Sequence, residues 1–387
     1  KVVELGQLIA GPFATKLLGE FGADVIKIEP PGTGDPLRKW RILEEGTSLW
    51  WHVQSRTKRS VTLDLRSEEG QEMVRRLAAE ADVIVENFRP GTLEGWGLGY
   101  ETLSTINPKL IMVRVSGFGQ TGPYRNKPGF GVIGEAMGGL RYLTGHAGEP
   151  SVRVGVSIGD SLSALYAVIG TLLALQERQR SGLGQEIDVA LYESVFAMME
   201  SLLPEFDATG HVREPSGSAL PGITPSNAYR TREGEYVLIA GNGDSIFKRL
   251  MGVIGREDLA NHPAMAHNDG RSQHASEIDA AIEAWTQTRH RDDILSALDD
   301  ARVPAGYPYT AADIANDPHY LAREMIQTVT RADGRPLKVP GVLPKLSATP
   351  GRLGQGGPKL GAHTDDVLEE LGIDAATRDK LRQAGII

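Results

Sequence analysis

Asp160 is the residue in this chain whose position most favours chemistry. It follows the alternating stretch VRVGVSIG and precedes SLSALYAVIGTLLALQERQRSG, a pattern that predicts an extended segment leading into a helix that ends near Gly182. A carboxylate at such a junction is either the N-cap of the helix or a nucleophile held ionised by the positive end of the helix dipole. Spacing alone leaves both interpretations open.

Polar and cationic side chains also gather where expected strands end. Arg38 and Lys39 follow the turn PPGTGDP, and Asn87, Phe88 and Arg89 come directly after the strand-like run VIVE. Loops after parallel strands converge on one edge of a sheet, where ligands bind, and cations there suit a phosphorylated ligand. The alternatives are solvated surface charges, a turn-forming Asn and a core Phe.

Other catalytic patterns are weak or absent. The nine histidines show no metal-ligand spacing, and no cysteine is present, which removes thiolate metal sites and Cys nucleophiles. We find no Ser-His-Asp ordering, no nucleophile elbow and no P-loop. The segment GQLIAGP, with Glu29 further on, is an incomplete dinucleotide fingerprint, so an NAD-dependent oxidoreductase is a weak alternative.

Composition narrows the class of protein. The 387 residues are 40% hydrophobic and 24% charged, and the net charge of −9 argues against a nucleic-acid-binding surface. The longest apolar runs fall short of a membrane span, and we expect a cytoplasmic protein. The chain begins directly in the strand-like run VVEL, which leaves a targeting segment open.

The elements that must position these side chains alternate between strand and helix. Pro12 is well placed as the first residue of a helix that runs to residue 21. We expect strands at residues 1–5, 24–29, 60–65, 82–86, 110–116 and 186–190. We expect helices at residues 12–21, 67–79, 132–143, 161–180, 192–203 and 364–371. This order predicts an α/β fold with a mostly parallel sheet covered by helices.

The character of the chain changes near residue 207. The stretch GHVREPSGSALPGITPSN predicts a linker or binding loop, and residues 228–230 and 236–240 predict a hairpin across TREG. We therefore expect a large domain over residues 1–205, a smaller α+β domain over 215–310, and a return to the large domain over 325–387.

Several strings together resemble the family III CoA-transferases, the family of formyl-CoA transferase and carnitine CoA-transferase. They are LIAGPFATKLLGEFGADVIKIEPPGTGD, TKRSVTLDLRSEEG, ADVIVENFRPGTLEGWGLGY, SGFGQTGPYRNKPGF, GVSIGDSLSALYAVIGTLLAL and KLGAHTDDVLEELGI. They span nearly the whole chain. The resemblance implies a Rossmann-like large domain made from both ends of the chain, an inserted small domain, and an interlocked homodimer.

The resemblance also implies site residues. Asp160 occupies the position of the family's nucleophile, which would form aspartyl anhydride and aspartyl-CoA intermediates. The matching CoA pocket begins at Ile9 and comprises Ala10, Leu63, Leu65, Arg66, Asn87, Phe88, Arg89 and Phe130. CoA is then a substrate, and we expect no tightly bound cofactor and no metal.

Departures from the family pattern bear on the substrate. Formyl-CoA transferase carries Gln at the position of Ile9 and Arg at that of Gly95, so formate or oxalate is not expected. The segments GFGVIGEAMGGLRYLTG and SGSALPGITPSN look closer to transferases that move CoA from succinyl-CoA to malate, citramalate, mesaconate, itaconate or glutarate. A second carboxylate in a closed site needs a cation, and the candidates are Arg38, Arg141 and Arg153.

Competing functions remain at this stage. A 2-methylacyl-CoA racemase would carry a catalytic His in the segment that reads GFGVIGEA here. A non-catalytic acyl-CoA-binding protein would not need Asp160.

Overall fold

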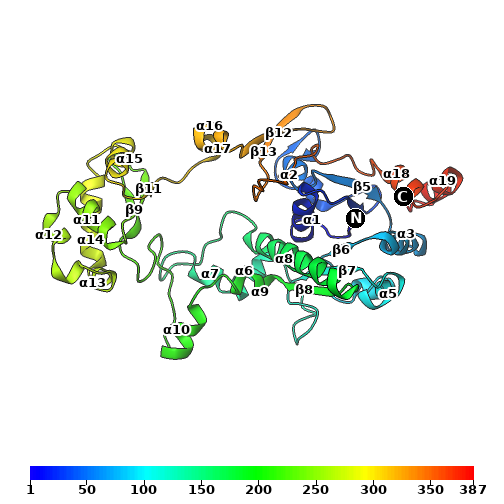
Figure 1. Ribbon diagram of the computed structural model, residues 1–387, viewed down its shortest axis with the longest axis horizontal. Helices are drawn as coiled ribbons and strands as arrows, with labels where there is room; N and C mark the ends of the chain where they lie inside the picture. Colours follow the sequence, from blue (N-terminus) through cyan, green and yellow to red (C-terminus); the bar gives the residue numbers. More distant parts are fainter. The chain divides into compact units, whose positions relative to one another are not determined.

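A computed structural model describes all residues from 1 to 387. The chain divides into two compact units. Unit 1 comprises Lys1–Arg141, Arg153–Val212 and His319–Ile387, and unit 2 comprises Tyr142–Val152 and Arg213–Pro318. Both chain termini therefore belong to unit 1, and both are marked in it in Figure 1. The short segment Tyr142–Val152, which the sequence analysis did not single out, belongs to the smaller unit.

Unit 1 is built on a six-stranded sheet in which every neighbouring pair of strands is parallel. Its strands, in spatial order, are β5 (Lys58–Thr62), β2 (Val25–Glu29), β1 (Val2–Glu4), β6 (Val83–Glu86), β7 (Ile111–Ser116) and β8 (Glu186–Ala190). Numbered by appearance within this sheet, the order is 3-2-1-4-5-6, the Rossmann order. The predicted α/β fold with a parallel sheet is confirmed.

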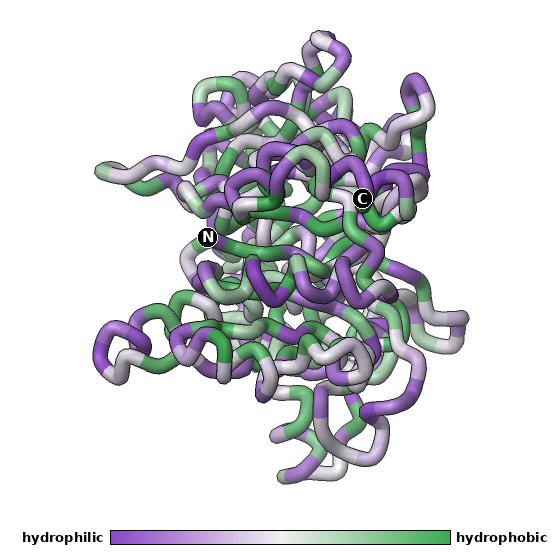
Figure 2. The backbone as a smooth tube through the Cα atoms, turned by 90° about the vertical axis from the view of Figure 1, so that its right-hand side faces the viewer, coloured by the Kyte–Doolittle hydropathy of each residue, from purple (hydrophilic) through white to green (hydrophobic).

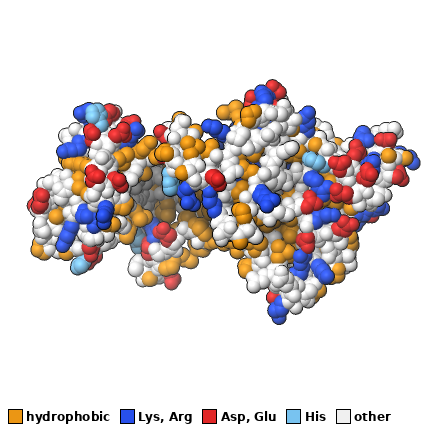
Figure 3. All heavy atoms as spheres, turned by 45° about the horizontal axis from the view of Figure 1, so that its top comes forward, with side chains coloured by type: hydrophobic (Ala, Val, Ile, Leu, Met, Phe, Trp, Pro, Cys, Tyr) orange, Lys and Arg blue, Asp and Glu red, His pale blue; other side chains and the backbone are white.

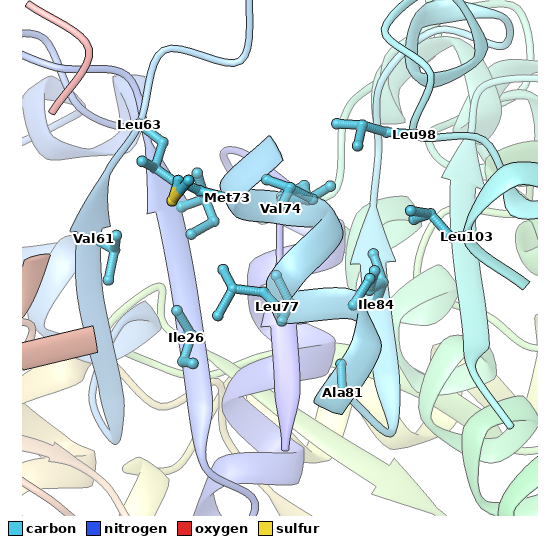
Figure 4. Packing of buried hydrophobic residues seen from close by; sticks show 14 of the residues in the cluster. Ile26, Val61, Leu63, Met73, Val74, Leu77, Ala81, Ile84, Leu98 and Leu103 are labelled. Atoms are coloured by element: carbon cyan, nitrogen blue, oxygen red, sulfur yellow. The ribbon is translucent and has the colours of Figure 1, made fainter. Parts of the chain in front are cut away.

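One face of the sheet is covered by α3 (Glu68–Glu80), which begins after the capping side chain of Ser67. Met73, Val74 and Leu77 project from one side of this helix at helical spacing and are buried. Figure 4 shows them packed against side chains of the strands. In Figure 2, the segments beside the marked N-terminus are coloured hydrophobic, as expected for strands buried on both faces.

The other face carries α1 (Ala10–Glu20) and α8 (Ile158–Ser181). Ala164, Ala167 and Ala174 of α8 are buried with Val113 and Val115 of β7, and these small side chains let the helix approach the strands closely. By length and composition alone, α8 would be long enough and apolar enough to cross a membrane, so the expectation that no run reaches that length was wrong. One side of α8 packs into the core of unit 1, and 33% of its apolar window is buried.

The opposite side of α8 is exposed. Leu165, Ile169, Leu172 and Leu173 are 45%, 51%, 56% and 62% exposed. Figure 3 shows hydrophobic side chains reaching the surface among charged ones in several places. A contiguous apolar helix face of this kind marks an interaction surface more often than chance exposure.

Helix boundaries depart from the sequence expectations in specific places. Helix α1 begins at Ala10, so Pro12 is its third residue and not its first. The helix expected over residues 132–143 is interrupted at Gly139, whose φ is +96°, and forms α6 (Gly131–Met137) and α7 (Leu140–Leu143). The helix expected over 192–203 likewise divides into α9 (Leu191–Phe196) and α10 (Leu202–Thr209). The extended segment before Asp160 forms no strand.

The remaining elements of unit 1 lie outside the main sheet. Those that come before β7 in the chain are η1 (Pro36–Lys39), β3 (Leu43–Glu44), β4 (Thr47–Ser48), α2 (Leu49–Gln54), α4 (Thr92–Gly95) and α5 (Tyr100–Ile106). Those of the C-terminal part are the hairpin β12 (Ile326–Thr330) and β13 (Pro336–Pro340), followed by α18 (Thr364–Glu370) and α19 (Ala375–Gln383). The predicted C-terminal helix is present as α18, and its Val367 and Leu368 are buried in the unit 1 core.

Unit 2 contains an antiparallel sheet in the order β11-β10-β9, packed against helices around its own core. The strands are β9 (Ser226–Arg230), β10 (Tyr236–Ala240) and β11 (Ala305–Gly306), and the expected hairpin is present as β9 and β10. The helices are α11 (Asp244–Val253), α12 (Glu257–Ala260), η2 (Pro263–Met265), α13 (Asn268–Gln273), α14 (Ala275–Thr286), α15 (Arg291–Asp300) and α16 (Ala311–Asn316). A last short helix, α17 (Pro318–Ala322), spans the boundary between the units.

Candidate active site

A cavity of about 730 Å³ opens in unit 1 where the strand order reverses. The loop after β1 and the loop after β6 both line it, and these strands are neighbours in the sheet. Ligands of open α/β sheets bind in the crevice at this switch point, outside the carboxyl ends of the strands. Asp160 lines the same cavity. The residue singled out for chemistry and the expected ligand loops are therefore brought together.

Asp160 lies in the first turn of α8, but it is not the N-cap. Ser157 occupies the cap position, Ile158 and Gly159 follow, and Asp160 is the third helical residue. The interpretation of Asp160 as the capping residue was therefore wrong by one helical turn. A carboxylate in the first turn still faces the positive end of the helix dipole.

Gly131 makes room for the Asp160 carboxylate. It is the first residue of α6, and a Cβ built on it would lie 2.2 Å from Asp160 Oδ2, which no real side chain could tolerate. The first N–H groups of a helix have no intrahelical acceptor. The start of α6, at Gly131 and Val132, therefore provides donors beside the carboxylate.

Burial raises the pKa of Asp160 to about 6, and the charge of Glu135 raises it further while Arg153 opposes the rise. At neutral pH the group is still mostly ionised, and it is more basic than an ordinary aspartate. The helix dipole was expected to favour the charged form. Burial of the carboxylate outweighs that effect.

Glu135 was missed by the sequence analysis. It lies on α6, is fully buried, and its Oε1 accepts a hydrogen bond of 3.4 Å from the Gly159 N–H. Its Oε2 has no hydrogen-bond partner, and the nearest cation is Arg153, whose Nε lies 3.9 Å away. The available signal was a single acid within the apolar and small-residue run GFGVIGEAM.

Among the expected CoA-binding residues, Ala10, Asn87, Phe88, Arg89 and Phe130 line the cavity. Phe88 packs edge-on against Trp96, with ring centroids 5.4 Å apart, and Phe130 is 67% exposed. Asn87 was predicted to belong to the CoA pocket, with a turn-forming role as the alternative. Its amide oxygen accepts from the Gln7 N–H and its amide nitrogen donates to the Gln7 carbonyl, both at 2.8 Å, so this side chain holds the loop after β1.

Leu63, Leu65 and Arg66 do not line this cavity. Leu63 is buried in the core beneath α3, as Figure 4 shows, and Leu65 packs against the same cluster. The Arg66 side chain is 80% exposed and pairs with Asp64. Their assignment to CoA binding stays a prediction.

Cations line the cavity from separate segments. Arg41 lies over the ring of Trp50 and Lys127 over the ring of Tyr124. The cationic lining is completed by Arg89, Arg125 and Arg153. Asp160 is the only acidic residue in the lining. This distribution suits a ligand that carries several negative charges.

The three arginines proposed to bind the acceptor carboxylate differ in whether they line the cavity. Arg38 is buried, forms an ion pair with Glu29, and stacks over Trp51 with its guanidinium 3.7 Å from the ring centroid. It is therefore committed to the fold and does not line the cavity. Arg141 does not line the cavity either, whereas Arg153 does, and the Arg153 side chain is 49% exposed.

The loop after β1 is fixed from below by buried charges. Leu8 has a φ of +65°, and its N–H donates to both carboxylate oxygens of Asp35 at 3.1 and 3.2 Å. Lys27 donates to the Gly6 carbonyl at 2.9 Å and forms ion pairs with Asp35 and Glu4 at 2.8 and 2.6 Å. Positive φ is costly for leucine, so this network holds the loop in a conformation it would not adopt alone.

Comparison with known proteins agrees with this fold. A sequence model of CoA-transferase family III matches residues 1–364. The chain is 51% identical over 372 residues to succinyl-CoA–D-citramalate CoA-transferase of Chloroflexus aurantiacus, covering 96% of this chain and 92% of the relative. It is 43% identical over 375 residues to the succinyl-CoA–L-malate CoA-transferase beta subunit of the same organism, covering 96% and 93%.

A solved structure extends the comparison to three dimensions. The crystal structure of a CAIB/BAIF family protein from Brucella suis matches with a TM-score of 0.83 and 38% identity, over 96% of this chain and 97% of that one. The fold and the sequence therefore agree. The chain belongs to CoA-transferase family III, and it is an enzyme that transfers CoA.

Proposed function

We propose that this enzyme moves CoA from succinyl-CoA to a small dicarboxylic acid of the citramalate or malate type. The observation that carries the proposal is the identity of 51% with a succinyl-CoA–D-citramalate transferase along nearly the whole chain. The cavity agrees with it, because a carboxylate nucleophile faces a lining that is otherwise cationic or apolar. Mesaconate, itaconate and glutarate are further acceptors of the same class.

Asp160 acts as the nucleophile. Its carboxylate oxygen attacks the thioester carbonyl carbon, the C–S bond breaks, and the electron pair leaves on the CoA sulfur. The CoA thiolate then attacks the aspartyl carbonyl of the mixed anhydride and releases succinate. The acceptor carboxylate attacks the aspartyl-CoA thioester, and the same steps run in reverse. No step requires a proton transfer, and the cavity lining contains no histidine.

The N–H groups of the first turn of α6 support the oxyanions of these steps. Gly131 and Val132 line the cavity beside Asp160. Preorganised backbone donors at the position where negative charge develops stabilise such intermediates by several kcal/mol, on the order of 3 kcal/mol per donor. Gly131 therefore serves the carboxylate by its lack of a side chain and the oxyanion by its N–H.

CoA and the acceptor use different cations. Arg41, Arg89, Arg125 and Lys127 would neutralise the phosphates of CoA, which a charge-assisted contact from arginine suits well. Arg153, on the segment that leads into α8, would hold the distal carboxylate of the acceptor.

A racemase is not favoured. Phe130 occupies the place before α6 where the racemases were expected to carry a catalytic His. Without an acid–base pair around the substrate α-carbon, proton abstraction has no agent. The matched relatives named above are both CoA-transferases.

We further propose that two copies of the chain form an interlocked homodimer. The exposed Leu165, Ile169, Leu172 and Leu173 on α8 form an apolar face that a second copy would cover. An interlocked pair cannot separate without unfolding, so dimer stability becomes folding stability. Sedimentation at nanomolar concentration should show a dimer, and folded monomer would contradict the proposal.

The function is tested by an acceptor panel and by the intermediate. Purified enzyme is incubated with succinyl-CoA and each of a set of mono- and dicarboxylic acids, and acyl-CoA products are quantified by mass spectrometry. We expect turnover with a branched or hydroxylated dicarboxylate. Incubation with acyl-CoA alone should leave a covalent adduct on Asp160. Preference for a monocarboxylate would overturn the acceptor class and leave the transferase class intact.

A further inference from the structure

Two carboxyl groups, only one of which lines the cavity, lie in an arrangement that the mechanism above does not use. Asp160 faces the cavity, and Glu135 is completely buried behind it on α6. Each side chain packs against a glycine on the other's helix. Asp160 Oδ2 lies against Gly131, and Glu135 Cγ lies 3.1 Å from the position of a Cβ on Gly159. Neither glycine could be replaced without displacing one of the carboxyls.

Glu135 is poorly compensated for a buried acid. Its Oε1 receives a single long hydrogen bond of 3.4 Å from the Gly159 N–H, and its Oε2 receives none. The nearest cation, Arg153, is 3.9 Å away and half exposed to solvent. A buried charged group that only stabilised the fold would be expected to have its hydrogen-bonding capacity filled. The arrangement therefore points to a role in the reaction.

The charge of Asp160 changes during the reaction, and that of Glu135 does not need to. Before attack, Asp160 is a carboxylate beside another carboxyl. When it attacks the thioester, a C–O bond forms, the C–S bond breaks, and the negative charge leaves with the CoA sulfur. In the anhydride and in the aspartyl-CoA thioester, Asp160 carries no charge. Repulsion from Glu135 therefore acts on the free carboxylate and is relieved in both covalent states.

We propose that Glu135 is a positioning residue that disfavours the free carboxylate of Asp160 by like-charge repulsion and thereby favours attack and the covalent intermediates. This inference rests on the proposed role of Asp160 as the nucleophile. Only interactions that differ between the reactant and the transition state change the rate of the chemical step, and this repulsion is such an interaction.

Among the charged groups around Asp160, Glu135 is the acidic one that repels its carboxylate. Arg153, from the segment before α8, opposes the repulsion in part. From α9, the residue that lines the cavity is the apolar Leu191. Arg125 and Lys127, on the loop before α6, line the cavity and are expected to engage CoA. Burial is the main cause of the raised Asp160 pKa, about 6, and the charge of Glu135 adds to the rise while Arg153 opposes it.

The decisive variant is Glu135→Gln. Glutamine has the same size and still accepts from the Gly159 N–H, so only the charge is lost. We expect the Asp160 pKa to fall by about one pH unit in the free enzyme. It is measured by carbon NMR of carboxyl-labelled aspartate, with Asp160→Asn identifying the resonance. The acid limb of kcat/KM for acyl-CoA should shift to lower pH by the same amount.

Two further readouts separate this role from a structural one. The fraction of enzyme carrying an Asp160 adduct at a fixed acyl-CoA concentration should fall severalfold in Glu135→Gln, whereas KM for CoA should change little. Glu193→Gln is the matched control, because Glu193 is an exposed carboxylate on α9 outside the cavity lining, and it should leave all these quantities unchanged. Glu135→Asp restores the charge and should recover part of the pKa elevation.

The NMR titration needs no substrate, so it distinguishes the two proposals. If the Asp160 pKa falls but wild type shows no succinyl-CoA turnover, the proposed function fails and the repulsion stands. An unchanged pKa and an unchanged adduct fraction in folded Glu135→Gln would overturn the role of Glu135. If that variant does not fold, Arg153→Gln supplies the test: removing the opposing cation should raise the Asp160 pKa, and no rise would overturn the proposal.

Discussion

Buried charges are paired with opposite charges on one side of the cavity and poorly compensated on another. Beneath the loop after β1, Lys27 is paired with Glu4 and Asp35, and Asp35 also receives the Leu8 N–H. Beside α6 and α8, Asp160 and Glu135 are acids with little compensation. The paired charges hold a backbone in place, and we propose that the poorly compensated acids keep the Asp160 carboxylate reactive. Satisfied charges fix position, whereas a nucleophile needs a charge that remains poorly stabilised until it reacts.

The largest effect is expected from Asp160→Asn, which removes the proposed nucleophile. Turnover of acyl-CoA should fall by about a thousandfold or more, because the amide is a poor nucleophile and no neighbouring group replaces it. Steady-state assays with circular dichroism of the same sample check this. A folded variant that keeps its activity would show that the nucleophile lies elsewhere.

Removing a charge from the buried network beneath the loop after β1 should mainly lower the free energy of unfolding. Lys27→Met leaves Asp35 buried without its ion-pair partner and leaves Glu4 with Lys58 alone, and removing one partner of a buried pair costs about 3–5 kcal/mol. Urea unfolding measures the loss. Lys39→Met is the control, because Lys39 is an exposed lysine that donates to the Gly46 carbonyl, and its replacement should change stability little. Equal effects in the two variants would mean that the buried network does not hold the loop.

Arg89 and Arg66 test which cations face CoA. Arg89 lines the cavity and Arg66 does not, although the family resemblance places both in the CoA pocket. Arg89→Ala should weaken CoA binding by about tenfold to a hundredfold, the value of one charge-assisted contact, whereas Arg66→Ala should bind nearly as wild type. Titration calorimetry with free CoA decides it. The reverse ranking would place the CoA phosphates outside this cavity.

The smallest effect concerns how the Asp160 carboxylate changes the stability of the protein with pH. The folded-state pKa of Asp160, about 6, lies above its ordinary value of 3.8, so the folded state binds the proton more tightly than the unfolded chain. The resulting loss of stability is complete above the folded pKa and vanishes as pH falls below the ordinary value. Asp160→Asn should therefore stabilise the protein by about 1 kcal/mol at neutral pH and not at acid pH. Thermal melts across this range provide the measurement, and a variant that is less stable at neutral pH would show that Asp160 supports the fold.

Local patterns in the sequence identified most of the elements. Strand β8 matches its expected bounds at residues 186–190, and α3 begins directly after the predicted cap Ser67. These elements are set by alternation, helical spacing and capping chemistry, all of which act within a few residues. The helices expected over 132–143 and 192–203 were too long because single residues, such as Gly139 and Glu200, adopt positive φ in response to packing.

The sequence by itself determined the parallel α/β fold and the family, and it singled out Asp160 as the candidate nucleophile, because these depend on local patterns and on long matching strings. Only the tertiary structure decided how the side chains are used. Asn87 holds a loop, Arg38 belongs to a buried pair, and Arg153 is the candidate arginine that lines the cavity. Glu135 had no sequence signal beyond its isolation. Glu135 became a candidate because α6 and α8 bring it close to Asp160 in the folded chain. Electrostatic coupling depends on distance in space and on burial, and sequence spacing specifies neither.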